Sequence, residues 1–373
     1  MNSTTQGEAE RTVSVTTGAR LHVGMFSFGP FDEEAPIDQA PRRFGGVGWM
    51  VDQPAVRLRA SISPSGDWEA RGPHAQRALA AAKRVVERLR LRVPPPLLIE
   101  VLDAPPEHVG LGTGTQLTMA VATALHRFRD LEGDVRDVTE SDLRTGDGSS
   151  IDFMPGTSPL RSESPAGDEE VSEWIARTNR AKRSTVGTYG GLRGGFIIEA
   201  GKRRLEELSP LVGRVDVPSR WRFLLVRPKR TEGLSGAAER QAFAQLSPPS
   251  FDVTAELYRE ATRRMFPAVQ RGDFWEFAGS LTRFGRLAGA CFAPAQHGEY
   301  CTERVADVAA RLIDLGAPAA VQSSWGPTLV VPTLDADAAK ELVLNIQQAF
   351  PEEWLDVVVA GPKNDGMTVV VSS

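Results

Sequence analysis

The sequence has 373 residues, of which 41% are apolar and 24% charged, with 35 Gly and 26 Pro. This composition is typical of folded globular proteins and excludes the fibrous, disordered and membrane-spanning classes. The formal charge of −5, from 43 basic and 48 acidic side chains, excludes a surface that is basic throughout, so any anion site is local and we expect no binding to nucleic acid or membranes.

The length favours two domains, since one domain usually has roughly 100 to 200 residues, although one large α/β domain would also fit. The two cysteines, Cys291 and Cys301, are too few for a disulfide framework and indicate reduced thiols. The polar stretch from Met1 to Thr17 lacks the apolar segment of a secretory signal. We therefore expect a cytoplasmic location.

The first part of the chain predicts two strands and a helix. Apolar residues alternate with polar ones over 21–25 and 56–62, on either side of the glycine-rich segment 44–48. Apolar residues at helical spacing begin near Ala75, and three prolines at 94–96 should end that helix.

A strand at 97–102 precedes a glycine-rich loop and a second helix, whose apolar face runs from Leu117 to Phe128. Glycines let backbone N–H groups approach an anion, and a helix N-terminus carries about half a positive charge, so the loop predicts phosphate binding. It is not a Walker loop, because no Lys follows its last glycine, and Leu117 stands where a dinucleotide-binding fingerprint has glycine. An ordinary turn is the alternative. The predicted phosphate ligands are Gly110, Gly112, Thr113, Gly114, Thr115 and Gln116.

An acidic tract occupies residues 130–170, where twelve Asp or Glu stand against three Arg. It lacks helical or strand periodicity and is rich in Ser, Gly and Pro, which predicts a surface insertion. We expect a short linker in its place to cost little stability, because loop-closure entropy changes slowly with length.

A basic cluster follows a predicted helix near 171–176 and directly precedes Ser184. Its members are Arg177, Arg180, Lys182 and Arg183. Arg offers planar, bidentate donors to phosphate or carboxylate, so the cluster predicts a second anion-binding segment. The alternative is a solvated face that balances the acidic tract.

The rest of the chain predicts helices and strands in separate runs, which favours an α+β sandwich. Glycines at 194–195 precede a strand at 196–198, and residues 202–220 resemble a connection. Beyond them we expect strands at 223–226, 328–331, 356–360 and 367–371, and helices near 252–266, 303–315 and 338–350.

A polar turn at 321–328 precedes one of these strands and offers hydroxyl groups, an amide and an aromatic ring for substrate binding. Its candidate residues are Gln322, Ser323, Ser324 and Trp325, and the alternative is an ordinary turn with a core Trp. The histidines are scattered, and His22 is a candidate because it adjoins a glycine-rich segment. The absence of a Gly-x-Ser-x-Gly elbow disfavours a nucleophilic hydrolase.

Five segments, in this order, resemble the β-ribofuranosylaminobenzene 5′-phosphate synthases, a branch of the GHMP kinase superfamily. They are 20–24, 43–48, 106–117, 183–190 and 322–328, and the resemblance spans about residues 12 to 335. The acidic tract departs from the family pattern, as does Thr113, where the superfamily commonly has Ser.

The resemblance implies an α+β fold, a GHMP kinase-like two-domain α/β sandwich with the active site between the domains. We place the domains at 12–210, including the acidic insertion, and at 211–373. The implied reaction joins 5-phosphoribosyl 1-diphosphate to 4-aminobenzoate or 4-hydroxybenzoate and releases CO2 and diphosphate, on the route to tetrahydromethanopterin. Mg2+ is the implied cofactor, and a homodimer is possible.

From the residue chemistry and the resemblance together we assign expected roles. The expected catalytic residues are Arg183, Ser184 and His22. Arg180 and Lys182 join the glycine loop in binding phosphate, and Thr115 is the candidate metal ligand. Gly45 and Gly46 join the turn at 322–325 in binding substrate.

Two other functions compete with the transferase. The first is an ATP-dependent kinase of small molecules on the same scaffold, and it is weakened because residues 186–188 hold no acid where kinases of this fold with a catalytic Asp carry it. The second is a non-catalytic sensor of a phosphorylated ligand, which would not need polar residues retained in both 180–184 and 322–324.

Overall fold

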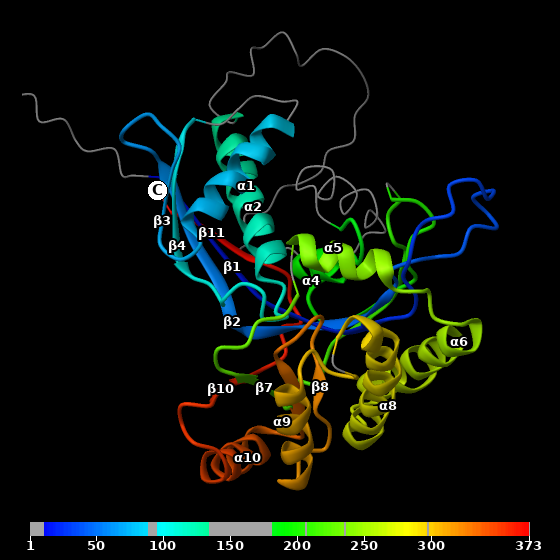
Figure 1. The fold of residues 1–373 in the computed structure, drawn as a ribbon. Coiled ribbons are helices and arrows are strands. Elements are labelled where there is room, and N and C mark those ends of the chain that lie inside the picture. Colours follow the sequence, from blue (N-terminus) through cyan, green and yellow to red (C-terminus); the bar gives the residue numbers. More distant parts are fainter. Residues whose placement is uncertain are drawn as a thin grey trace, which may run out of the picture.

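The computed structural model describes residues 11–88, 95–133, 181–205, 207–234, 236–296 and 298–372. Arg180, the helix expected near 171–176 and the acidic tract from residue 134 onward lie outside these ranges. The described chain forms a seven-stranded sheet and a four-stranded sheet, with helices around both (Figure 1).

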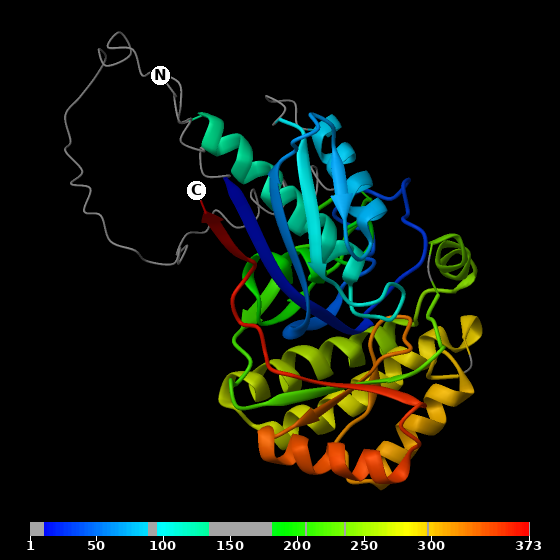
Figure 2. The same cartoon turned by 90° about the vertical axis from the view of Figure 1, so that its left-hand side faces the viewer.

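The seven-stranded sheet is built on two long strands, β1 (Thr12–Met25) and β2 (Gly46–Ile62), which pair antiparallel from Thr12↔Ser61 to Met25↔Gly46. Two strands share β2 as a neighbour: β4 (Leu97–Asp103) pairs with its second half and β5 (Phe196–Glu199) with its first four residues. Three shorter strands complete the sheet: β3 (Glu69–Arg71), β6 (Leu211–Val215) and β11 (Thr368–Ser372). In Figure 2 the red strand β11 lies beside the blue strand β1.

Two helices, α1 (Ala75–Arg88) and α2 (Thr113–Gly133), cover one face of this sheet (Figure 1). Their small apolar residues pack on alternate residues of β1, β2 and β4 and form a buried core. Because side chains of a strand alternate between faces, the same strands supply a second apolar set to the opposite face. The packing of α2 on the sheet holds this helix in place, and with it the N-terminus of α2 at Thr113.

The second sheet has the order β10-β7-β9-β8 and is antiparallel. Its strands are β7 (Arg222–Pro228), β8 (Val321–Gln322), β9 (Leu329–Thr333) and β10 (Leu355–Ala360). Helices α9 (Glu303–Asp314) and α10 (Ala336–Ala349) form a core with one face. The other face shares the largest core with the first sheet and with α6 (Phe251–Arg259), α7 (Phe266–Arg271) and α8 (Phe274–Phe292).

Two further helices are α4 (Val186–Arg193), which packs against α2, β1, β2 and β5, and α5 (Gly236–Gln245); Figure 1 shows both on the same side of β2 as α2. Phe243 of α5 packs in an aromatic cluster with Phe28, Phe44, Phe292 and Trp325. The cluster joins the segment between β1 and β2 to α5, to α8 and to the turn before β9. A short 3-10 turn, η2 (Ala293–Ala295), ends α8.

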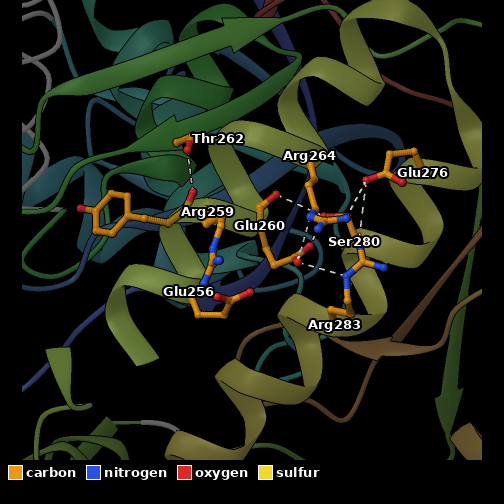
Figure 3. A network of polar contacts seen from close by, with 9 residues as sticks. Glu256, Arg259, Glu260, Thr262, Arg264, Glu276, Ser280 and Arg283 are labelled. Atoms are coloured by element: carbon orange, nitrogen blue, oxygen red, sulfur yellow. Dashed lines mark hydrogen bonds and ion pairs between the residues drawn. The ribbon is translucent and has the colours of Figure 1, made fainter. Parts of the chain in front are cut away.

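A π-helical segment, η1 (Glu260–Met265), joins α6 to α7 and presents a buried carboxylate to α8. Glu260 is 2% exposed, and it accepts hydrogen bonds from Ser280 at 2.8 Å and from Arg283 at 3.0 Å. Figure 3 shows Arg264 and Glu276 completing this network. It ties α8 to the preceding helices.

Most predicted strands and helices are present, and several elements were not predicted. Residues 202–220 are more than a connection, since they contain β6. Helices α4, α5 and α8 and strands β3 and β8 were missed. The first residues of the acidic tract, 130–133, are helical because α2 continues to Gly133.

The predicted boundary after residue 210 does not coincide with the division between the two sheets. Strands β6 and β11 come from the second half of the chain and pair with β5 and β1 of the first sheet. Among the described helices, none combines the length and the apolar character needed to cross a bilayer.

Candidate active site

A cleft of about 560 Å³ brings the glycine loop and the basic segment together. It is lined by the first turn of α2, by residues 181–184 before α4, by the start of α5 and by the turn 324–326. Residues from both halves of the chain therefore form it. Six cationic side chains line it against two carboxylates, Glu107 and Glu239. The cations are Arg20, Arg77, Arg84, Lys182, Arg183 and Arg240.

Two glycines of the loop have backbone conformations that favour glycine. Gly110 and Gly112 have φ of 84° and 71°, a region that L side chains rarely adopt. A Cβ at Gly112 would lie 2.8 Å from the Arg20 Nε, and one at Gly114 would lie 2.1 Å from an Arg77 nitrogen. The missing side chains thus allow two guanidinium groups to approach the N-terminus of α2.

Arg20 was absent from the predicted ligands, although it begins one of the motifs behind the resemblance. It lies on β1 in the cleft, and no carboxylate of the described residues forms an ion pair with it. Its Nε is inaccessible and has no hydrogen-bond partner. Burial lowers the pKa of Arg20 to about 10, against the opposing charges of Glu239 and Glu199. Arg20 therefore stays cationic at neutral pH.

Arg183 lines the cleft as predicted, and it is held by two neighbours on α5. Its guanidinium forms an ion pair with Glu239 at 2.7 Å and lies over the Phe243 ring at 4.8 Å. These contacts orient the planar donors before a ligand arrives. Lys182 also lines the cleft and is exposed.

Ser184 lines the cleft directly before α4, and a buried carboxylate holds its segment. The two oxygens of Glu199 accept hydrogen bonds from the Thr185 N–H at 2.9 and 2.8 Å. Burial raises the pKa of Glu199, and hydrogen bonds from Ser184, Thr185 and Ser209 oppose the rise. Glu199, which was not among the predicted site residues, thus holds the segment that precedes α4.

Glu107 organises the other wall of the cleft. Its carboxylate pairs with Arg77 at 2.6 Å and lies 3.6 Å from His74 and 3.5 Å from His108. It therefore orients Arg77 beside the first turn of α2.

Several predicted site residues have structural roles. The Thr113 hydroxyl donates to the Pro106 carbonyl at 3.0 Å, although the residue lines the cleft. Gln116 is buried outside the cleft, where it accepts from Thr17 at 2.8 Å and donates to the Gly187 carbonyl at 2.7 Å. Ser323 is also buried, and its hydroxyl donates to the Gly110 carbonyl at 2.7 Å.

The two glycines predicted to bind substrate line neither the cleft nor the cavity beside it. Gly45 packs on the backbone of Ala200 and Gly201, and a Cβ at Gly46 would lie 2.9 Å from the His22 Nε2. Both positions permit close packing, which is a structural reason for glycine.

His22 is 2% exposed, and its Nε2 is buried with no hydrogen-bond partner. Burial, followed by the charge of Arg20, lowers the pKa of His22 to about 3, so the ring is neutral. It lines the neighbouring cavity and not the cleft. A general acid at neutral pH would require a protonated ring, so this geometry does not support that role.

The remaining predicted residues lie where the cleft meets that cavity. Ser324 and Trp325 line both spaces, and Gln322 lines the cavity alone. The Ser324 N–H donates to the His22 carbonyl at 2.7 Å, which attaches this turn to β1.

The cleft offers oxygen donors for Mg2+ but no preformed cage. The described residues contain no cluster of three or more His, Cys, Asp or Glu side chains suited to a metal. Thr115, Glu107 and Glu239 line the cleft and provide hard oxygen ligands. This donor set fits Mg2+ that is held mainly by substrate phosphates.

The chain has sequence relatives but matches no family model. It is 22% identical over 340 residues to "Beta-ribofuranosylphenol 5'-phosphate synthase" of Methanothermobacter thermautotrophicus, covering 84% of this chain and 87% of the relative. A protein of the same name from Archaeoglobus fulgidus is 24% identical over 341 residues, covering 88% and 92%. These relatives confirm the resemblance inferred from the motifs, and with it the prediction of an enzyme.

Solved structures share the fold at lower identity. Homoserine kinase from Cytophaga hutchinsonii has a TM-score of 0.57 and 17% identity, covering 99% of this chain and 100% of its own. Mevalonate diphosphate decarboxylase from Staphylococcus aureus has a TM-score of 0.57 and 12% identity, covering 97% and 98%. The predicted GHMP kinase-like α+β fold is therefore confirmed.

Proposed function

We propose that this protein is a decarboxylating phosphoribosyltransferase that joins 5-phosphoribosyl 1-diphosphate to a para-substituted benzoate. The observation that carries the proposal is the convergence of Arg20, Arg77, Lys182 and Arg183 with the N-terminus of α2 on one cleft. A substrate with a diphosphate and a 5′-phosphate needs this number of donors. The names of the two relatives support the same reaction class.

The cleft stabilises charge where the reaction develops it. The bond between ribose C1 and the diphosphate oxygen breaks, and its electron pair leaves with the diphosphate. Cations and backbone N–H groups that are already in place stabilise that leaving group at little reorganisation cost. Mg2+ bound to the diphosphate would neutralise further charge, with Thr115, Glu107 and Glu239 as the available protein ligands.

The second step forms the carbon–carbon bond. The ring carbon that bears the carboxylate attacks ribose C1, with electron release from the para substituent. The bond from that carbon to the carboxylate then breaks, its electron pair restores the aromatic ring, and CO2 departs. No strong general base is required, which agrees with a neutral, buried His22 and with two cleft carboxylates that are both ion-paired.

The relatives' names contain a phenol, which corresponds to a 4-hydroxybenzoate acceptor. We therefore propose 4-hydroxybenzoate or 4-aminobenzoate as the acceptor, in the cytoplasm, on a route to tetrahydromethanopterin.

The main alternative is an ATP-dependent kinase, because solved structures with this fold include kinases. The first turn of α4, residues 186–188, contains Val, Gly and Thr and no carboxylate to accept a proton from a substrate hydroxyl. The transferase is favoured for this reason.

The test is to incubate purified protein with phosphoribosyl diphosphate, Mg2+ and each carboxyl-labelled benzoate, and to count released CO2. A parallel reaction with ATP and homoserine measures ADP. Release of CO2 that requires phosphoribosyl diphosphate supports the transferase. ADP formation without CO2 release would support the kinase.

A further inference from the structure

A second cavity, of about 210 Å³, opens beside the cleft. Met25, Ser324 and Trp325 line both spaces, so the two meet at these residues. The cavity extends from there between β1, α8, the end of α9 and strand β8. We call it the side cavity.

The side cavity is suited to an aromatic ring. Phe243, Phe292 and Trp325 line it, and their rings meet edge to face, with centroids 5.0 to 6.0 Å apart. Edge-to-face contacts add about 0.5 to 1.5 kcal/mol per aromatic pair beyond burial, so a further ring placed among them would gain such contacts. Small residues of α8, Gly285, Ala288 and Gly289, form another wall.

Several polar groups around the side cavity are already bonded within the protein, although its lining also includes Arg286 and Glu299 and the unpartnered Nε2 of His22. Gln322 accepts from the Cys301 N–H at 2.7 Å and donates to the Ser324 carbonyl at 3.1 Å, and the Tyr300 hydroxyl donates to the Ala320 carbonyl at 3.1 Å. These polar groups therefore need no ligand. The side cavity differs from the cleft, where six cations converge.

The junction of the two spaces is where a ribose and a ring would meet. Arg183 lines the cleft and lies over Phe243, which lines the side cavity, so a cation and an aromatic wall stand side by side. A benzoate whose ring enters the side cavity would turn its charged carboxylate toward the cations and its apolar carbons away from them. That orientation presents the carbon that bears the carboxylate to the cleft.

From this geometry we propose that the side cavity is the binding site for the aromatic acceptor, a para-substituted benzoate. This assignment rests on the proposed function for its choice of acceptor. It makes the walls of the side cavity, and not the cationic cleft, the determinant of affinity for the ring.

The test blocks or enlarges the side cavity without touching the cleft. Ile313 is 46% exposed and lines the side cavity but not the cleft, so Ile313→Trp can fill part of the side cavity without disturbing the core. Leu344→Trp is the matched control, because Leu344 is 50% exposed on α10 and lines neither space. Phe292→Ala is a second variant, which removes one aromatic wall.

Calorimetry with 4-hydroxybenzoate, in the presence and absence of phosphoribosyl diphosphate, is the readout, alongside the KM of each substrate. We expect Ile313→Trp and Phe292→Ala to weaken benzoate binding by about tenfold or more, and to leave phosphoribosyl diphosphate binding within about twofold. The control should match the wild type.

Unchanged benzoate binding in both cavity variants would overturn the proposal, as would a wild-type protein that binds no para-substituted benzoate. If CO2 release fails but benzoate binding is lost in both cavity variants, the site assignment stands and the proposed reaction is wrong.

Discussion

Replacing Arg20 tests whether this buried cation serves substrate binding or the stability of the fold. The side chain lies in the cleft against Gly112, with no ion pair to a described carboxylate, and burial is the main cause of its lowered pKa. A cation kept under these conditions costs folding free energy unless a ligand pairs with it. Arg20→Met should therefore impair catalysis without impairing stability.

The size of the effect follows from the bonds that a phosphate would lose. One charge-assisted hydrogen bond contributes about 1.5 to 3 kcal/mol, which predicts a fall in kcat/KM of about 10- to 150-fold. Arg20→Lys should recover only part of the loss, because Lys keeps the charge but not the planar fork. Removing the desolvated cation should leave the free energy of unfolding unchanged or raise it by up to about 2 kcal/mol.

The assay combines steady-state kinetics of CO2 release with urea denaturation of each variant. Arg59→Met is the control, because Arg59 is exposed on β2 and does not line the cleft. Wild-type kcat/KM in Arg20→Met would refute the assignment. A loss of stability that accounts for the lost activity would show that Arg20 is structural.

Four further outcomes are expected. Arg183→Ala should lower kcat/KM by about 10- to 150-fold, whereas Arg304→Ala, which removes a similar cation–π contact outside the cleft, should not. Burial lowers the pKa of His22 to about 3 from 6.5, so its contribution to stability is present above pH 6.5 and is lost as pH falls toward 3. At about pH 5 this loss should reach about 2 kcal/mol in urea denaturation and be absent in His22→Gln. Glu260→Gln should cost about 1 to 3 kcal/mol of stability, and Glu276→Gln, at the exposed side of the network, at most about 1 kcal/mol. Chelation of Mg2+ should abolish CO2 release and its restoration should recover it, so undiminished turnover after chelation would contradict the metal requirement.

The sequence predicted the elements whose apolar residues repeat regularly within a single segment. Alternation in β1 and β2 and helical spacing in α1, α9 and α10 identify half-buried elements, and these are present. Helix α8 was missed although its buried residues Phe274, Phe277, Leu281, Phe284 and Ala288 follow helical spacing, so this signal was present in the sequence and was overlooked. Strand β6 was missed because its place depends on pairing with β5, a contact that periodicity does not show.

The sequence indicated those cleft residues that belong to a glycine-rich loop or to a cluster of basic residues. The glycine loop and Arg183 line the cleft, as expected. Arg20 was missed because a lone arginine in a strand shows nothing of the glycines that it will face. Gln116 and Ser323 lie outside the cleft because their polar groups bond to backbone of other segments, at Gly187 and Gly110. Such partners are known only once the chain has folded.

The most direct test of the central claim follows the two carbons on which the reaction depends. The protein is incubated with phosphoribosyl diphosphate, Mg2+ and 4-hydroxybenzoate carrying 13C either in the carboxylate or at the ring carbon that bears it, and the product is analysed by mass spectrometry and NMR. The account predicts a ribosyl phosphate that retains the ring label, bonded directly to ribose C1, and has lost the carboxylate label as CO2. A product that retains the carboxylate label, or a reaction that only transfers phosphate from ATP, would contradict it.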